Sequence, residues 1–254
     1  MIYMASISNN EIKRIKSLQQ KKFRDETGLF VVEGEKMVEE ARRSGLKVEN
    51  IYYRDQIGQE AMERISSLSS PSPVLAVVRK PEDVYVADSD DLKSLISDKG
   101  LYLGLDTIRD PGNLGTILRI ADWFGVDAVF ATRDTVDVFN PKVVQATMGA
   151  IFRVKMHYVD LPALSETVLT AGGKVYGTFL DGRNMYRLDL DPGLTSPVMI
   201  VTGNESEGIS DRMEELVSDR LYIPPYPADS PGSESLNAAV ATALTVAEFR
   251  RRTL

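Results

Sequence analysis

Residues 101–124, which read LYLGLDTIRDPGNLGTILRIADWF, decide the fold class of the chain. The apolar run at 101–106 predicts a buried strand, and after a polar loop the residues 116–124 predict a helix. Strands that alternate with helices predict an α/β fold with a mostly parallel sheet covered on both faces. Further apolar runs, separated by helical patterns, follow at 127–132, 175–180, 198–202 and 221–223.

The loop after this first strand carries candidate functional side chains, because ligands bind beyond the carboxyl ends of parallel strands. At 100° per residue, Arg119 lies on the side of the predicted helix opposite its apolar stripe. An ordinary alternative for Arg119 is a salt bridge to Asp122 three residues later, and Asn113 could equally be a turn or cap residue. The stripe itself consists of Leu114, Ile117, Leu118, Ala121 and Phe124.

A second loop, TGNESEGIS at residues 202–210, follows directly after an apolar strand. Gly203 and Gly208 permit positive φ or a close approach of the backbone to a ligand. The loop differs from a phosphate loop, because Ile209 and Ser210 stand where that motif needs Lys followed by Ser or Thr. Two carboxylates in the loop would also repel phosphate, so the ligand expected here is neutral or cationic.

A third loop extends over residues 223–237 and leads into an alanine-rich helix at 238–250. Ser235 is a reasonable N-cap for this helix. Its many small residues predict that another backbone packs closely against it. The apolar stripe of the helix consists of Leu236, Val240, Ala243, Leu244 and Ala247.

Composition limits the class of protein. The chain has 254 residues, enough for one large domain or two modest ones, and its 43% hydrophobic and 26% charged residues are typical of globular proteins. No apolar run approaches the roughly 18 residues of a membrane span, and the N-terminus does not resemble a secretory signal. The absence of cysteine excludes disulfides and thiolate chemistry and fits a reducing cytoplasm. With His157 as the single histidine, neither a His-based metal site nor a Ser-His-Asp triad is expected.

The formal net charge of −7 conceals a division along the chain. Residues 1–80 contain 14 Lys and Arg against 11 Asp and Glu, whereas residues 81–254 contain 16 against 26. A basic segment can contact the phosphates of a nucleic acid, although a solvated helix face is the ordinary alternative. The basic excess is concentrated in Lys13, Arg14, Lys16, Lys21, Lys22 and Arg24.

Residues 1–80 are expected to form a small α/β unit of their own. A helix is predicted from Asn9 or Asn10, a second helix opens at Gly34, and residues 81–97 are acidic, lack a pattern and are interpreted as a linker. The remaining residues, 98–254, then form the second domain. Strands of the first unit are predicted at 29–32, 51–53 and 74–78.

Together, the three loops resemble the three motifs of the SpoU (TrmH) family of RNA ribose 2'-O-methyltransferases within the SPOUT superfamily. Each loop is ordinary by itself, but their order and their position after strands match the family. Residues 1–80, with GLFVVEG at 28–34, also resemble the RNA-binding domain that many members carry at the N-terminus, a small α/β fold similar to some ribosomal proteins.

This resemblance implies a trefoil-knotted C-terminal domain, one of the exceptions to the rule that chains do not thread loops. The domain would bind S-adenosylmethionine in a bent shape and form a homodimer through the knot. The backbones of Gly203, Ile223 and Leu236 would contact the cofactor. The wider set implied around the cofactor is Thr202, Gly203, Asn204, Gly208, Ile223, Pro224 and Leu236. Asn113, Arg119, Glu205, Ser235 and Asn237 match the functional polar positions of the family.

The implied reaction is transfer of a methyl group from S-adenosylmethionine to a ribose 2'-hydroxyl, with ribosomal RNA as the expected substrate and no metal. A guanidinium is effectively always protonated, so Arg119 is expected to bind a phosphate and stabilise the developing alkoxide rather than act as the base. Transfer RNA is the nearest alternative substrate, and a catalytically silent RNA-binding dimer scaffold is the alternative of another class. A dinucleotide-dependent oxidoreductase would need Gly-x-Gly-x-x-Gly where the chain has DPGNLG at 110–115.

Three positions depart from the common family pattern. Ala238 and Ala239 replace a Val-Ser pair, so one hydroxyl of the third motif is missing. The loop at 225–234 is longer than usual, which leaves the approach of the substrate open. The segment TMGA at 147–150 stands where a Ser-containing version is common, and it is interpreted as structural.

Overall fold

The computed structural model describes residues 7–86, 89–227 and 235–253. The chain divides into two compact units. Unit 1 comprises Met1–Glu82 together with Asp137–Arg153, and unit 2 comprises Asp83–Val136 together with Val154–Leu254. Each unit is therefore built from two separate stretches of the chain.

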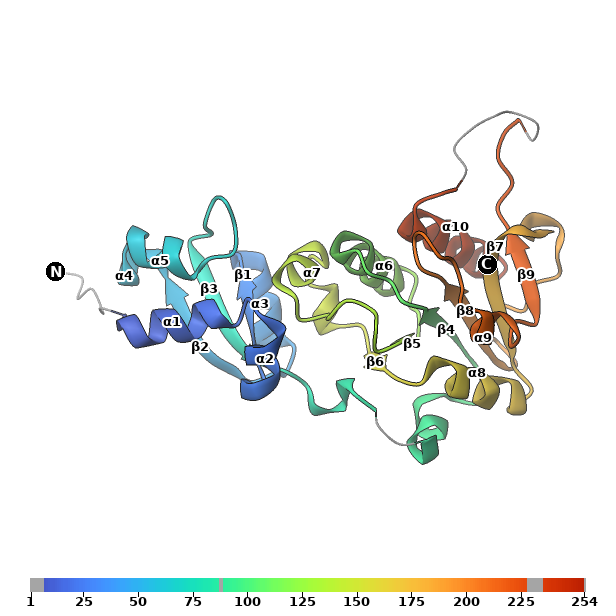
Figure 1. The fold of residues 1–254 in the computed structure, drawn as a ribbon, viewed down its shortest axis with the longest axis horizontal. Coiled ribbons are helices and arrows are strands. Elements are labelled where there is room, and N and C mark those ends of the chain that lie inside the picture. The colour runs from blue at the N-terminus through green and yellow to red at the C-terminus, as the bar shows by residue number, and fades with distance from the viewer. Residues whose placement is uncertain (1–6, 87–88, 228–234, 254) are drawn as a thin grey trace. The chain divides into compact units, whose positions relative to one another are not determined.

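Unit 1 is a three-stranded antiparallel sheet with helices on its faces (Figure 1). Strand β3 (Val74–Arg79) lies between β1 (Leu29–Glu33) and β2 (Val48–Tyr53). The helices α1 (Asn9–Ser17) and α5 (Gln59–Ile65) bury their apolar side chains against one face. The three predicted strands and the first helix are confirmed, and each strand extends at least one residue further than predicted.

The other face of this sheet is covered by a helix from each of the two stretches of unit 1. Helix α3 (Glu35–Arg43) comes from the N-terminal stretch, and α7 (Pro141–Ala146) comes from the segment between β5 and β6 of the second sheet. The ring of Phe139, just before α7, lies 4.8 Å from that of Phe30 on β1. The sequence pattern did not predict that this segment completes the core of unit 1. The short helices α2 (Lys21–Thr27), α4 (Arg54–Ile57) and η3 (Ala150–Phe152) were not predicted either.

Unit 2 contains a six-stranded sheet in which every pairing is parallel. The sheet confirms the predicted α/β architecture. Its strands run in the order β6 (Met156–Tyr158), β5 (Ala128–Ala131), β4 (Gly100–Leu105), β8 (Pro197–Thr202), β7 (Lys174–Asn184) and β9 (Asp219–Tyr222). The short edge strand β6 was not predicted, since three residues are too few to show a pattern.

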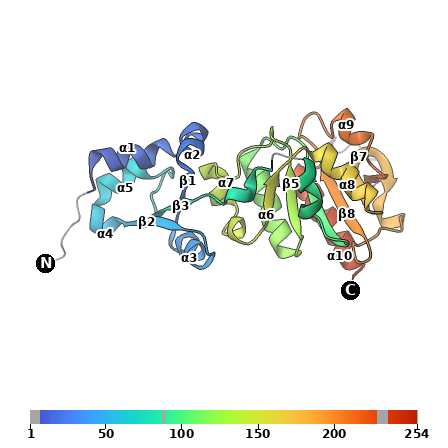
Figure 2. The ribbon, with the colours of Figure 1, turned by 90° about the horizontal axis from the view of Figure 1, so that it is seen from below.

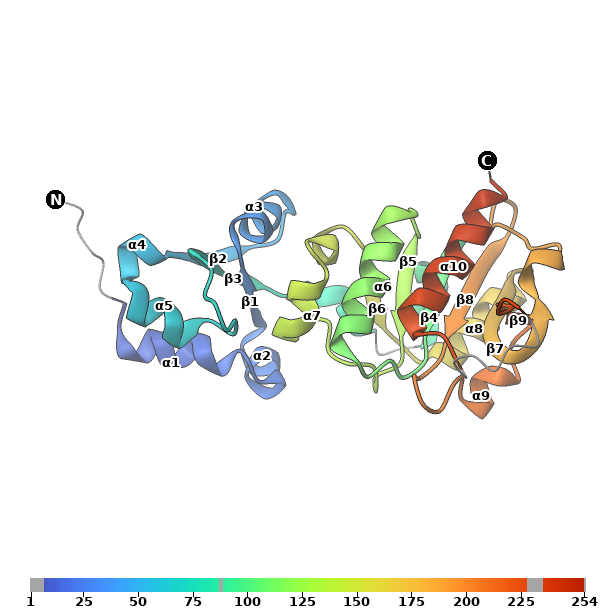
Figure 3. The same ribbon diagram turned by 90° about the horizontal axis from the view of Figure 1, so that it is seen from above.

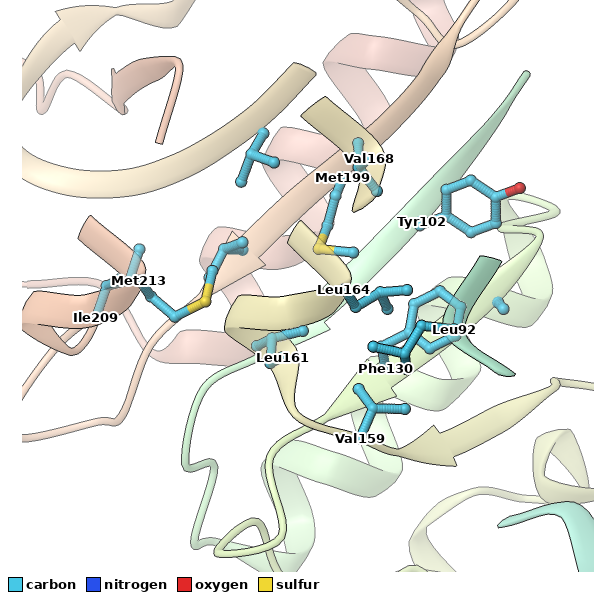
Figure 4. Close-up of a cluster of buried hydrophobic side chains, with 13 residues drawn as sticks. Leu92, Tyr102, Phe130, Val159, Leu161, Leu164, Val168, Met199, Ile209 and Met213 are labelled. Atoms are coloured by element: carbon cyan, nitrogen blue, oxygen red, sulfur yellow. The ribbon is translucent and has the colours of Figure 1, made fainter. Parts of the chain in front are cut away.

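Helices cover both faces of the parallel sheet. Figure 3 shows α6 (Pro111–Trp123) and α10 (Ala238–Arg251) side by side across one face. The opposite face carries α8 (Leu161–Thr170), with α9 (Asp211–Glu214) and the 3-10 helix η2 (Ser89–Leu95), as Figure 2 shows from below. Figure 4 shows how the side chains of this second face form one buried cluster around Leu164, Met199 and Met213.

Two further boundaries differ from the sequence-based expectation. Helix α6 begins at Pro111 rather than at residue 116, because Asp110 caps it by accepting the N–H of Asn113 at 2.7 Å and proline is favoured in the first turn. The stretch interpreted as a linker contributes η1 (Glu82–Val84) and η2, and Leu92 of η2 is buried in the core of unit 2.

The expected knot concerns the chain between β9 and α10, where residues 228–234 lie outside the described part. The 3-10 helix η4 (Met185–Arg187) follows β7. Among the residues described, no helix has the length and apolar character that crossing a membrane requires.

Candidate functional site

The first and second loops meet because β4 and β8 are adjacent parallel strands that end at the same edge of the sheet. The N–H of Asp106 donates to the carbonyl oxygen of Thr202 at 2.9 Å. The buried carboxylate of Asp106 accepts the N–H of Ser210 at 2.8 Å. One side chain at the end of β4 thus fixes the far end of the second loop, a role that the sequence analysis did not assign to it.

Asn204 joins the same two loops from the other side. Its side-chain N–H donates to the carbonyl oxygen of Thr107 at 2.8 Å, and its side-chain oxygen accepts the N–H groups of Ser206 and Glu207. Its backbone is paired with that of Gly208. These hydrogen bonds make Asn204 a structural residue of the loop, and its contact with a cofactor stays a prediction.

Thr107, another residue missed in the sequence, has φ of +62°. Such a conformation is strained for a β-branched residue and persists where surrounding contacts impose it. Here the N–H of Thr107 donates to Oγ1 of Thr132 at 2.9 Å while its carbonyl accepts from Asn204. No sequence signal distinguishes this threonine, since residues that favour left-handed backbone are usually Gly, Asn or Asp.

The tight turn of the second loop explains its two glycines. A Cβ on Gly203 would lie 2.2 Å from the backbone of Gly208, and Gly208 itself has φ of +76°. Thr202 turns its side chain away from the loop, because its Oγ1 is buried 2.9 Å from Oγ1 of Thr242 on α10. The contacts that Thr202 and Gly203 can offer a ligand are therefore those of their backbones.

A chain of three polar side chains links all three loops. The carboxylate of Glu205 accepts a hydrogen bond from the side-chain nitrogen of Asn113 at 2.8 Å. The side-chain oxygen of Asn113 accepts one from the side-chain nitrogen of Asn237 at 2.8 Å. These residues stand 92 and 124 positions apart in the sequence, and the fold brings them into one network.

The direction of this network is set by helix α10. Asn237 caps the helix, and its side-chain oxygen accepts the N–H groups of Ala239 and Val240. Its nitrogen must then point toward Asn113, whose own nitrogen is left for Glu205. The prediction that Ser235 is the N-cap is wrong, because the helix begins two residues later than that position requires.

Glu205 remains ionised under ordinary conditions. Burial raises the pKa of its carboxyl, but the hydrogen bond from Asn113 and those from the backbone outweigh this effect, so the pKa is lowered overall. The N–H groups of Arg109 and Asp110 lie 3.4 and 3.3 Å from the two carboxylate oxygens. A carboxylate with this pKa is suited to orient a neighbour rather than to take up a proton near neutral pH.

The remaining predicted residues of the site lie at or near the surface of unit 2. Arg119 is exposed on α6, and its guanidinium pairs with no residue in the described ranges, so the alternative salt bridge to Asp122 is absent. Ser235 is exposed and Leu236 is about half exposed (48%). Ile223 and Pro224, directly after β9, are partly exposed.

The cations predicted to bind RNA lie in unit 1 and differ in availability. Lys13 and Lys16 are exposed on α1 and form no ion pair within the part of the chain that the structure describes. Arg14 is held by Glu11 at 2.7 Å, while Lys21 and Lys22 are exposed and paired along α2 with acidic residues four positions later.

Arg24 is a correction to the predicted RNA-binding set. Its guanidinium is 2% exposed and donates to the carboxylate of Asp137 at 3.0 and 2.6 Å. The carbonyl oxygens of Leu18 and Gln19 accept two further hydrogen bonds from it. The reason is the segment Asp137–Arg153, which supplies the counterion and covers the side chain.

The model of the SpoU rRNA methylase family matches residues 100–247, which include all three loops. The chain belongs to the SpoU rRNA methylase family. A second model, of the MRM3-like substrate-binding domain, matches residues 9–80.

Relatives of this family resemble the chain over nearly its whole length. The 23S rRNA (guanosine(2553)-2'-O)-methyltransferase of Bacillus subtilis is 31% identical, with 98% of this chain and 100% of that protein covered. A TrmH-family protein from Porphyromonas gingivalis has a TM-score of 0.82 and 36% identity over 98% of this chain and 100% of its own. The AdoMet-bound rRNA methyltransferase of Sinorhizobium meliloti has a TM-score of 0.83 and 30% identity, with 98% and 97% covered.

Proposed function

We propose that the chain transfers a methyl group from S-adenosylmethionine to a ribose 2'-hydroxyl in ribosomal RNA. The observation that carries the proposal is the network of Glu205, Asn113 and Asn237, which joins the three family motifs at the carboxyl ends of the strands. The similarity to a 23S rRNA 2'-O-methyltransferase over the full chain supports the substrate and the reaction.

The residues present fit S-adenosylmethionine. The cofactor carries a sulfonium cation, and the second loop contributes the exposed carboxylates of Glu205 and Glu207. The backbone of Leu236 has no hydrogen-bond partner in the described ranges, so its polar groups are available to a ligand. Gly203, Ile223 and Leu236 would hold the cofactor through their backbones. When bound, it supplies an activated methyl group and needs no metal.

Arg119 is the side chain to which we assign the contact with the reacting nucleotide. It is exposed at the surface of α6, and its five N–H donors are not used by the described residues. A guanidinium placed there binds the phosphate next to the ribose and stabilises negative charge on the attacking oxygen. Asn113 and Asn237 hold their orientation through the network and position the substrate.

The RNA contact of unit 1 is assigned to the exposed lysines of α1 and α2. Lys13, Lys16, Lys21 and Lys22 are accessible, and their contacts with phosphate release counterions. Arg14 belongs to this group less strongly because Glu11 holds its guanidinium.

The exposed apolar side chains of helix α10 favour a second copy of the chain as a partner. The apolar stripe of an amphipathic helix ordinarily faces the core. On α10, Val240 and Leu244 are instead exposed by 48% and 39%, and Trp123 of the adjacent α6 is 85% exposed. Exposed apolar side chains on two neighbouring helices are typical of an interface, so we assign this face to a homodimer.

The test of the cofactor site uses calorimetry with S-adenosylmethionine. The native chain is expected to bind it saturably, and Leu236→Trp is expected to abolish binding without unfolding the chain, because Leu236 is exposed. Tyr226→Trp, at another exposed position of the same loop, serves as the control. Absence of binding to the native chain, with and without RNA, would favour the silent RNA-binding scaffold.

The test of catalysis compares substrates and Arg119 variants. Labelled methyl groups should enter unmethylated 23S rRNA, and total transfer RNA should remain unlabelled. Arg119→Lys keeps the charge but loses the planar fork, so the rate is expected to fall by about 100-fold. A rate close to that of the native chain would contradict the role assigned to Arg119. Preferential labelling of transfer RNA would select the alternative substrate.

A further inference from the structure

Arg109 stands at the tip of the first loop, four residues before Asn113 of the site network. Its backbone N–H faces the carboxylate of Glu205 at 3.4 Å, so its position relative to the network is fixed. Its side chain, in contrast, is 62% exposed. The loop therefore holds the backbone of this residue while its guanidinium faces water.

Among the residues that the structure describes, the guanidinium of Arg109 forms one ion pair, and its distance is long. Its Nη2 lies 3.6 Å from a carboxylate oxygen of Glu207, whose side chain is 67% exposed. This distance exceeds that of a hydrogen bond, and the guanidinium donates none to any residue in the described ranges. Exposed ion pairs of this kind contribute little to stability, so a stronger anion can displace Glu207.

Negative charge at the site repels RNA, and the cation of Arg109 can offset this repulsion. Glu205 and Glu207 both repel phosphates, and Glu205 stays ionised. A phosphate binds a guanidinium through two parallel hydrogen bonds, which a carboxylate at 3.6 Å does not form in this structure. The exchange of Glu207 for phosphate would therefore be favourable and would place the RNA backbone beside the network.

We propose that Arg109 is a phosphate-binding residue of the RNA substrate, separate from Arg119, and that Glu207 occupies it when RNA is absent. The inference rests on the proposed function of the chain as an RNA methyltransferase. Arg109 positions the backbone of the substrate at the site, and Glu207 competes with that contact. The two residues together tune how tightly RNA binds at this site.

A matched control exists on the same unit. Arg212 and Asp160 form an exposed ion pair at 3.7 Å, with side chains 66% and 54% exposed, outside the three motif loops. The distance and exposure are nearly those of the Arg109 pair, so loss of a surface cation alone has the same effect at both places. A difference between the two pairs then reports on the location of Arg109.

The experiment measures binding of an unmethylated 23S rRNA transcript to the full chain as a function of salt. Arg109→Ala is expected to weaken binding by roughly five- to ten-fold and to reduce the slope of log affinity against log salt by about 0.7 to 1, the value for one phosphate contact. Glu207→Gln is expected to strengthen binding, while Arg212→Ala and Asp160→Asn leave it unchanged. Binding of S-adenosylmethionine should be the same in Arg109→Ala, Arg212→Ala and Asp160→Asn as in the native chain.

Equal effects of Arg109→Ala and Arg212→Ala would overturn the inference, as would a lower kcat with unchanged RNA binding. A native chain that does not bind the transcript would refute the proposed function together with this inference. Binding and methyl transfer that do not depend on Arg109 would refute this inference alone.

Discussion

Helices α1 and α10 both carry a predicted apolar stripe. The stripe of α1 faces the core of its unit, whereas that of α10 faces solvent. Helix α1 buries Ile12 and Ile15 against the sheet of unit 1 and leaves its lysines in water. Helix α10 buries Thr242, Val246 and Phe249 against unit 2 and leaves Val240 and Leu244 of its predicted stripe exposed. An apolar stripe therefore identifies a face that is buried somewhere, within the chain or, as we propose for α10, between two chains.

The polar groups on the inner face of α10 are satisfied within unit 2. The hydroxyl of Thr242 donates to the carbonyl oxygen of Ala238, and that of Thr245 donates to Ala241, each four residues back along the helix. Glu248, also buried, accepts from Arg251 and Arg252. Burial of this face is thus compatible with the rule that buried polar groups are hydrogen-bonded.

The largest effect on stability is expected from the buried ion pair of unit 1. Asp137→Ala leaves the guanidinium of Arg24 buried without its counterion, which should destabilise unit 1 by about 3–5 kcal/mol. Glu26→Ala removes an exposed partner of Lys22 and should cost at most about 1 kcal/mol. Urea unfolding measures both values, and equal midpoints for the two variants would contradict the structural role of Arg24.

Truncation of a side chain in the buried stripe of α1 should lower the free energy of unfolding almost as much as loss of the buried ion pair. Ile15→Ala removes a fully buried side chain and should lower the free energy of unfolding by about 2–5 kcal/mol. Its exposed neighbour is the control, since Lys16→Ala should change stability by less than about 0.5 kcal/mol. A small loss for Ile15→Ala would mean that α1 does not form part of the core.

A substitution in the exposed stripe of α10 should change the affinity of the dimer rather than the stability of the single chain. Leu244→Asp is expected to weaken the proposed dimer by at least about 3 kcal/mol, or more than 100-fold, because the leucine of each protomer would be buried there. The stability of the single chain should change little. Sedimentation at several concentrations measures the effect, with Leu180→Asp on β7 as an exposed control. Unchanged association, or a native chain that is monomeric throughout, would contradict the assignment.

The smallest effect is expected from pH acting on the site network. The pKa of Glu205 is held below its ordinary value of 4.5, so its contribution to stability is complete above that value and is lost as pH falls through the lowered pKa. The rate of methyl transfer between pH 5 and 7 should therefore show no step from this group. Glu205→Gln should lower the rate by about ten-fold at all of these pH values, through loss of a charge-assisted hydrogen bond to Asn113. A step near pH 6 that the variant lacks would show that Glu205 takes up a proton.

The sequence was sufficient for the local elements and for the residues that meet at the site. Alternating strands and helices predicted the parallel sheet. The order of the motifs identified Asn113, Glu205 and Asn237, which the fold joins in one network. Periodicity reports the faces of single elements, and the order of strands reports which loops share an edge. Both kinds of signal depend only on neighbouring residues or on strand order, so the sequence alone is enough to predict these parts of the fold.

Other features depend on contacts between distant segments and left no local signal. The sequence predicts that Arg24 is an exposed cation. In the structure its partner is Asp137, which lies 113 positions later in the chain. The strained backbone of Thr107 depends on Asn204 and Thr132, and nothing in the identity of Thr107 indicates it. Such roles are decided by tertiary packing, where a single side chain determines whether a charge is buried or free.

Chemical identification of the product tests the central claim most directly. A ribose that carries a 2'-O-methyl group cannot use its 2'-oxygen to attack the neighbouring phosphodiester, so the bond that follows resists alkali. Unmethylated 23S rRNA is incubated with the native chain and methyl-labelled S-adenosylmethionine, hydrolysed in alkali and analysed by mass spectrometry. We expect label in alkali-resistant dinucleotides with the native chain and no label with Arg119→Ala. Label found only in the mononucleotides released by alkali, which would place the methyl group on a base, would contradict 2'-O-methylation.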